Sequence, residues 1–336
     1  MRTSHSNIVT TIAVVLLAMT LIPRHCGWSQ TGPVVAAIRE HSTVSRLDPV
    51  SQRERTIFRV DALRSALVEI SVHPGGALLA VLETSRPRST GAPNDVPHNR
   101  LVVMDTSGAI IESVQRNVQR FVWCCNGERL VYIAGAHREG EPGFRPDSVF
   151  LYDLGRRSHS PIALPIRPAE IAWAAFDSSV YFGASARGDS LEVWRLHTPS
   201  GEVTSTRYRG LLFSPSGRYY LWYGTGLNSR YGWHLVERAS GRELPIPDLS
   251  IGGIHGWMND GTDNLLLLRR SGSAPAPRSR QPRIRRAEPP MLFVVYDLLQ
   301  RRTVQQGTGT VASHTAVSEG VAINRGGRIQ VLRRPQ

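Results

Sequence analysis

A short phrase that recurs along the chain limits what this sequence can fold into. Its best copy, Leu211 to Trp222, reads as an apolar strand, a Ser-Pro-Ser-Gly turn and a second apolar strand. Apolar runs rich in β-branched and aromatic residues that stop at Gly, Pro, Ser or Asp are typical of strands joined by tight turns. The phrase therefore predicts a β-hairpin that the chain uses repeatedly.

Six copies are found when the chain is aligned on the end of the turn. The aligned residues are Gly76, Gly127, Asp177, Gly217, Gly261 and Gly327. The first five are 40 to 51 residues apart, and the last gap of 66 becomes 46 when the 20 residues 271–290 are set aside. A second apolar run, such as Val149–Leu154, follows each of the first five turns. A unit of this length has room for four short strands, which is typical of one blade of a β-propeller.

The sequence therefore predicts an all-β chain, a β-propeller of six blades with four antiparallel strands each; five or seven blades are the alternatives. After Gly327 there is room for one strand, Ile329–Leu332, so the last blade needs strands from elsewhere. We expect residues 30–55, together with the strand Thr56–Val60, to contribute to ring closure. The propeller itself is assigned to residues 56–336.

Residues 1–29 have the pattern of a secretory signal peptide. Arg2 precedes the uncharged run 8–22, and Gly27-Trp28-Ser29 offers a cleavage site before Gln30. The run is shorter than the ~20 residues that a membrane span needs. The sequence predicts an extracytoplasmic protein, periplasmic or secreted, with an uncleaved N-terminal membrane anchor as the alternative.

The net charge of +13 is distributed unevenly. One Pro-rich stretch carries seven arginines and no acid: Arg269, Arg270, Arg278, Arg280, Arg283, Arg285 and Arg286. Residues 271–290 are therefore predicted to be a disordered loop leaving one blade, and a candidate contact for anionic lipid, lipopolysaccharide or an acidic partner. Away from this stretch the charge balance is ordinary, which argues against a nucleic-acid partner.

No catalytic, cofactor or metal motif stands out in the sequence. The G-x-S-x-G pentad of propeller peptidases does not occur, and the histidines form neither H-x-H nor H-E-x-x-H. The segment Asn259–Asn264 resembles a calcium loop but falls on the repeated turn and lacks the closing Glu. We therefore predict no catalytic residue, no cofactor and no metal.

Two groups of apolar residues have a functional and a structural interpretation. Cys124-Cys125 is a potential redox pair, but neighbouring cysteines form only a strained ring, so we interpret them as small apolar residues at a strand end. One position of the repeat is aromatic: Trp123, Trp173, Phe213 and Trp257. We interpret these aromatic residues as core residues packed between blades, with a stacking site for sugars as the alternative.

The turn phrase resembles that of the TolB-like (PD40, WD40-like) β-propeller family, in which Ser-Pro-Asp-Gly stands between an apolar residue and an apolar strand. Phe213–Gly217 is the closest match, and Val72–Gly76 and Trp257–Gly261 match in part. The resemblance covers about residues 56–334 and does not include the α/β domain ahead of the propeller in TolB. It implies an extracytoplasmic propeller that binds a partner.

The function we expect is that of an exported, non-enzymatic, monomeric module that binds a protein or a polymer of the bacterial cell envelope. The alternative is a propeller enzyme of the lyase, lactonase or glycosidase type, with acidic or His residues at the central channel. Close carboxylates or His residues at the channel mouth would favour the enzyme, and an apolar or Arg-lined mouth would favour binding.

Overall fold

A computed structural model describes residues 34–85, 98–137, 144–185, 191–225, 231–246, 252–258, 261–270, 291–312, 315–325 and 328–333. The predicted signal peptide 1–29 and the Arg-rich loop 271–290 lie outside these ranges. All strands belong to one compact unit, Pro33–Gln336. Within the described ranges, no helix has the length and apolarity that crossing a membrane requires.

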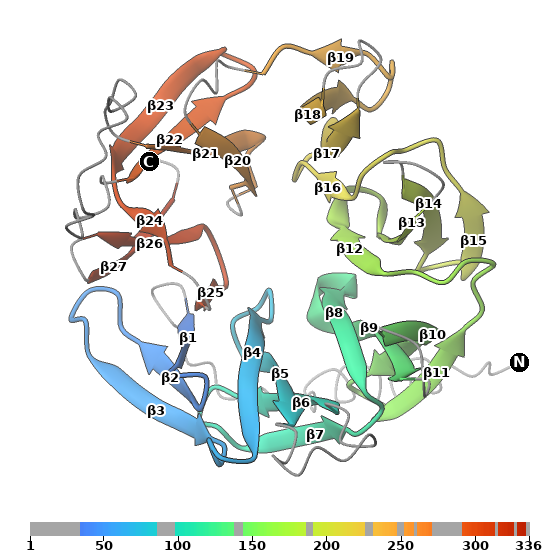
Figure 1. Cartoon of the computed structure of the whole chain (residues 1–336), viewed down its shortest axis with the longest axis vertical. Coiled ribbons are helices and arrows are strands. Elements are labelled where there is room, and N and C mark those ends of the chain that lie inside the picture. The colour runs from blue at the N-terminus through green and yellow to red at the C-terminus, as the bar shows by residue number, and fades with distance from the viewer. Residues whose placement is uncertain are drawn as a thin grey trace, which may run out of the picture. The chain divides into compact units, whose positions relative to one another are not determined.

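The strands form antiparallel sheets arranged radially around a common axis, as in a β-propeller (Figure 1). Blades 1 to 5 each use four consecutive strands, so the predicted blade is confirmed. They are β4–β7 (Ser65–Val72, Leu78–Ser85, Asn99–Asp105, Ile110–Val114), β8–β11 (Val118–Cys124, Arg129–His137, Phe144–Asp153, Ser158–Ile162), β12–β15 (Glu170–Ala174, Ser179–Ser185, Leu191–His197, Glu202–Ser205), β16–β19 (Leu212–Phe213, Tyr219–Thr225, Tyr231–Glu237, Glu243–Leu244) and β20–β23 (Gly252–Trp257, Asn264–Arg270, Met291–Asp297, Arg302–Thr308).

A sixth four-stranded blade closes the ring with strands from both ends of the propeller, in the order β25-β1-β2-β3. Its strands are β1 (Val35–Arg39), β2 (Thr43–Leu47), β3 (Glu54–Arg59) and β25 (Thr315–Val317). Hydrogen bonds of 3.1 Å between the Val34 and Ser318 segments continue the pairing of β1 with β25. The prediction that N-terminal strands close the ring is confirmed.

The sixth copy of the repeat was expected to pair with the N-terminal strands, and this part of the prediction is wrong. Its strands belong to a separate three-stranded sheet, β24-β26-β27, and do not receive the N-terminal strands. The strands are β24 (Thr310–Val311), β26 (Val321–Arg325) and β27 (Arg328–Leu332). The N-terminal strands pair with β25, which has only three residues and therefore too few for a recognisable apolar alternation.

The repeated turns lie on one edge of the ring, which we call the turn edge, and there they contact the neighbouring blade. A Cβ atom on Gly217 would lie 2.1 Å from Cγ of Phe176 in blade 3, and one on Gly127 would lie 1.9 Å from Nε2 of His73 in blade 1. The Ser216 backbone N–H donates to Oδ1 of Asp263 at 3.0 Å, which joins blades 4 and 5. The turn therefore links blades, as expected for an element that identifies the ring.

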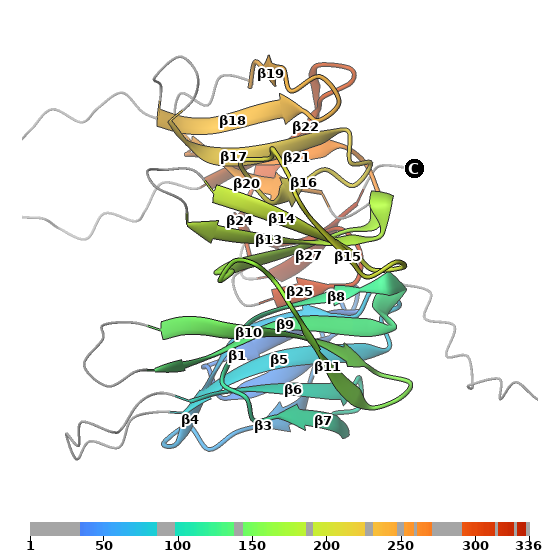
Figure 2. The same cartoon turned by 90° about the vertical axis from the view of Figure 1, so that its right-hand side faces the viewer.

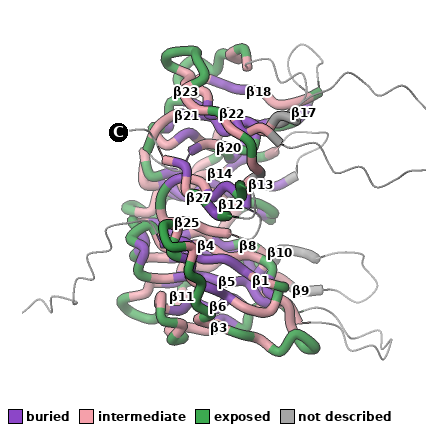
Figure 3. The backbone as a smooth tube through the Cα atoms, turned by 90° about the vertical axis from the view of Figure 1, so that its left-hand side faces the viewer, coloured by how far each residue is buried: buried purple, intermediate pink, exposed green. Residues whose placement is uncertain are grey.

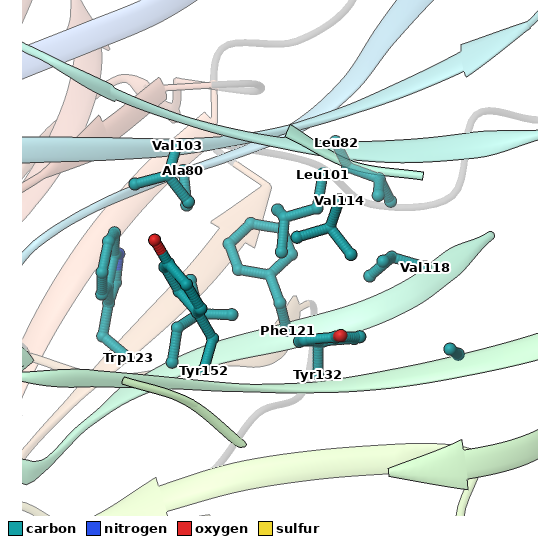
Figure 4. Packing of buried hydrophobic residues seen from close by; sticks show 12 residues of the cluster. Ala80, Leu82, Leu101, Val103, Val114, Val118, Phe121, Trp123, Tyr132 and Tyr152 are labelled. Atoms are coloured by element: carbon teal, nitrogen blue, oxygen red, sulfur yellow. The ribbon is translucent and has the colours of Figure 1, made fainter. Parts of the chain in front are cut away.

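The core lies between the faces of adjacent blades. Buried positions follow the strands, whereas exposed positions gather at their ends (Figure 3). Figure 4 shows side chains of blade 1, such as Leu82 and Leu101, facing Phe121 and Tyr132 of blade 2. The recurring aromatic residues also lie in apolar clusters, and Trp123 is 4% exposed, in agreement with the structural interpretation.

Candidate ligand-binding cleft

The arginines singled out in the sequence divide between described and undescribed residues. Arg269 and Arg270 form the end of β21, paired with Leu292 and Met291 of β22. Arg278, Arg280, Arg283, Arg285 and Arg286 lie outside the described residues. The structure therefore shows where the Arg-rich loop 271–290 leaves blade 5. Its contact with anionic lipid, lipopolysaccharide or an acidic partner stays a prediction.

A cleft of about 390 Å³ lies at the seam between blades 3 and 4. Part of its lining comes from the starts of β14 and β18, which lie at the edge of the ring opposite the turn edge (Figure 2). Glu170 and Leu191 begin β12 and β14, and Tyr223 and Trp233 lie near the β17–β18 connection. Arg120 on β8 also reaches the cleft, so three consecutive blades contribute to it.

The cleft combines a small charged set with a large apolar surface. Its ionisable residues are Arg120, Glu170 and Arg209, all exposed. The rest of the lining is apolar or aromatic apart from a glycine: Ile171, Ala172, Leu191, Gly210, Leu211, Leu212, Leu221, Trp222, Tyr223 and Trp233. Two guanidinium groups beside one carboxylate give the cleft a positive balance.

Arg209 also lines a second cavity of about 190 Å³, which is formed by blade 4 and by residues 207–209 ahead of it. Its guanidinium lies 5.4 Å from the ring centroid of Trp222, within cation–π range. The opposite charge in this cavity is Glu243, and Arg207 and Arg238 complete its basic side. A guanidinium held against an aromatic face keeps its planar donors available for a carboxylate or phosphate.

Exposed aromatic rings stand next to the cleft on blade 4. Tyr223 is 51% exposed and Tyr231 64%, and their ring centroids lie 5.0 Å apart in a T-shaped contact. Trp233, the cross-strand partner of Tyr223, lies 5.3 Å away in a second edge contact. Large rings this exposed offer surface for stacking against a sugar, a side chain or a peptide plane.

A half-buried carboxylate, Glu69, interacts with Arg120 of this charged set. Burial raises the pKa of Glu69 on β4, and the positive charge of Arg120 partly opposes that rise. Arg120 therefore faces a carboxylate of blade 1 as well as the cleft. Within the described ranges, no group of three His, Cys, Asp or Glu side chains is placed to hold a metal ion.

Sequence reasoning did not identify Arg120, Glu170 or Arg209. Each lies at or near the start of an inner strand, in a different repeat, and the three are 50 and 39 residues apart. The local sequence offers only Arg207-Tyr208-Arg209, which Gly210 separates from the best copy of the turn phrase.

Comparison with known proteins supports the fold and leaves the function open. No protein-family model matches the chain, and no curated protein matches its sequence. Puromycin hydrolase is similar in structure, with a TM-score of 0.54, 13% identity and coverage of 82% of this chain and 43% of that chain. Oligogalacturonate lyase from Vibrio parahaemolyticus has a TM-score of 0.50, 11% identity and coverage of 65% and 63%.

TolB from Acinetobacter baumannii is also similar, with a TM-score of 0.49, 13% identity and coverage of 95% of this chain and 74% of that chain. The chain spans less than two thirds of the length of the two oligogalacturonate lyases that it matches. At such identities the likeness concerns the β-propeller fold alone. The neighbours include enzymes as well as TolB, so they do not choose between catalysis and binding.

Proposed function

We propose that this chain is an exported binding module of the TolB-like propeller type, and that the cleft between blades 3 and 4 receives an acidic segment of a protein or polymer. The composition of the cleft carries the proposal: Arg120 and Arg209 outnumber Glu170 above an apolar, aromatic floor. An excess of arginine over carboxylate above an apolar floor favours binding of an acidic ligand over acid–base chemistry.

Each part of the cleft has a role in such binding. Arg209 forms charge-assisted hydrogen bonds to a carboxylate, because its guanidinium is exposed and oriented by the Trp222 ring. Tyr223 and Trp233 provide the stacking surface beside it. Glu170 repels carboxylates, so we expect the acidic groups of the ligand to lie beside Arg120 and Arg209 rather than beside Glu170.

The proposal is tested by titrating the full chain with polygalacturonate and poly-glutamate as acidic probes and dextran as a neutral one. We expect the acidic probes to bind and Arg209→Ala to weaken that binding about tenfold, or ~1.4 kcal/mol. Arg64→Ala is the control, because Arg64 is exposed ahead of β4 and contacts Asp61 at 3.4 Å. Unchanged affinity in Arg209→Ala, or equal affinity for dextran, contradicts the proposal.

The enzyme alternative is an outcome of the same experiment. Size-exclusion chromatography after the incubation shows whether the polygalacturonate chains have become shorter. Shorter chains would favour a propeller enzyme of the lyase or glycosidase type. Loss of that shortening in Glu170→Gln would place the chemistry in the cleft.

The proposed export and the Arg-rich loop need separate tests. Cell fractionation with N-terminal sequencing should give a chain beginning at Gln30 outside the cytoplasm, whereas a membrane-bound chain beginning at Met1 would support the anchor. Deleting residues 271–290 should abolish salt-sensitive binding to vesicles of anionic lipid. Unchanged vesicle binding would exclude that loop as the contact.

A further inference from the structure

The two neighbouring cysteines occupy the turn of blade 2 in an unusual arrangement. Cys124 ends β8 and is fully buried, whereas Cys125 begins the following 3₁₀ turn (Cys125–Gly127) and is half-buried. Their sulfur atoms lie 3.5 Å apart. Successive side chains of a strand point to opposite faces, so this proximity has to come from the backbone.

The backbone of the turn accounts for the proximity. Cys125 and Asn126 both adopt left-handed conformations, with φ of 54° and 55°. Consecutive non-glycine residues in this region are uncommon and cost free energy. The left-handed Cys125 turns its side chain back towards Cys124.

Blade 3 shows that the repeat does not require the sulfur atoms. The corresponding 3₁₀ turn (Ala175–Asp177) has Ala174 and Ala175 where blade 2 has the two cysteines. Its left-handed residue is Ser178, with φ of 51°, at the end of the turn. The turn therefore forms with two alanines, and the left-handed cysteine is a feature of blade 2.

The surroundings give the two thiols different properties. The hydrogen bond between the two sulfur atoms is the main cause that lowers the pKa of Cys125 to about 6. The Thr198 hydroxyl and the charge of Arg129 also lower it, and burial opposes them. The same contact and burial raise the pKa of Cys124. At neutral pH the half-exposed sulfur is a thiolate, and the buried one keeps its proton next to it.

We propose that Cys124 and Cys125 form a reversible vicinal disulfide by exchange with a low-molecular-weight disulfide. The Cys125 thiolate attacks one sulfur of the small disulfide, which forms a mixed disulfide and releases one thiolate. Cys124 then loses its proton and attacks Sγ of Cys125, which forms the vicinal disulfide and releases the second thiolate. Two protein thiols are oxidised, and one small disulfide is reduced to two thiols.

A disulfide at this position serves as a switch rather than as a permanent cross-link. Neighbouring Cα atoms are about 3.8 Å apart, below the ~4.4 Å minimum of ordinary disulfides, so the ring is strained and easily reduced. Cys124 also packs against Val180 and Phe182 of blade 3. Its redox state is therefore coupled to the contact between blades 2 and 3.

The test treats the folded full chain with oxidised glutathione, blocks free thiols and digests it with trypsin. Cleavage after Arg120 and Arg129 yields peptide 121–129, which contains both cysteines and excludes Cys26. We expect this peptide to lose the mass of two hydrogen atoms and to regain it with dithiothreitol.

Two single variants separate the steps. Cys124→Ala should stop at the glutathione adduct on Cys125, and Cys125→Ala should leave Cys124 unmodified while the chain is folded. Both should fold, because blade 3 has alanine at both positions. A wild-type peptide that keeps two free thiols, or that accumulates only the glutathione adduct, would overturn the proposal.

Discussion

At the scale of single residues, Gly217 shows why the repeated turn ends in glycine. Its φ is +71°, and a Cβ atom would lie 2.1 Å from Cγ of Phe176. We expect Gly217→Ala to lower the free energy of unfolding by about 2–4 kcal/mol, through left-handed strain and overpacking. Gly201→Ala is the matched control, because Gly201 has φ of +73° and nothing within 4 Å of such a Cβ atom. Urea denaturation gives the free energy of unfolding of both variants, and the difference between them is the contribution of the contact between blades. Equal losses would contradict a role for that contact.

Glu69 gives the fold a pH dependence of a definite sign. Burial raises the pKa of this carboxyl in the folded chain, so the native state binds a proton more tightly than the unfolded state. The stability contribution of Glu69 therefore falls as pH rises from the unfolded pKa through the folded one. Glu69→Gln should raise the thermal unfolding midpoint at pH 7 and leave it unchanged at pH 3. Glu202→Gln, at an exposed position of β15, is the control, and an equal rise there would argue against burial as the cause.

At the scale of elements, one ion pair joins adjacent strands inside blade 1. Glu83 on β5 is 7% exposed and faces Arg100 on β6, whose Nε donates to Oε2 of Glu83 at 3.0 Å. Arg100→Met keeps the aliphatic stem but leaves a buried carboxylate unpaired, so we expect a loss of about 1–3 kcal/mol. Arg39→Met breaks the more exposed pair with Glu54 and should cost less than about 1 kcal/mol. Chemical denaturation measures the loss in free energy of unfolding for both variants. A larger loss for Arg39→Met than for Arg100→Met would contradict the prediction.

At the scale of the whole molecule, a side chain takes the place of a missing strand. The three-stranded sheet ends at β27, and the Gln52 amide covers that edge: Nε2 donates to the Ile329 carbonyl at 2.8 Å, and Oε1 accepts from the Ile329 N–H at 3.1 Å. These bonds connect positions 277 residues apart and tie the closing blade to its neighbour. Gln52→Met should lower the free energy of unfolding by about 1–3 kcal/mol, because both bonds to Ile329 and the bond from Nε2 to the Pro49 carbonyl are lost. Gln115→Met, at an exposed site, is the control, and equal effects would show that the edge contact is unimportant.

The sequence alone determined the propeller because its signals are local. An apolar strand, a turn ending in Gly and another apolar strand are properties of about ten neighbouring residues, as Leu211 to Trp222 shows. Their recurrence then implies sheets that must stack to bury both faces. Closure of the ring by N-terminal strands was also predicted, but the copy at the end of the chain, which was expected to receive them, forms a sheet of its own.

Only the tertiary structure decided which strands meet and where a ligand could bind. The partner of β1 is the three-residue β25, whose sequence carries no recognisable alternation. The cleft brings together Arg120, Glu170 and Arg209 from consecutive repeats, and the Cys124–Cys125 contact depends on a left-handed backbone. Local patterns do not show the cleft, because stacking of the blades places side chains together that are tens of residues apart. They do not show the cysteine contact either, because it depends on the backbone angles of the turn. The turn phrase thus specifies the ring, and the packing between its copies specifies the candidate site.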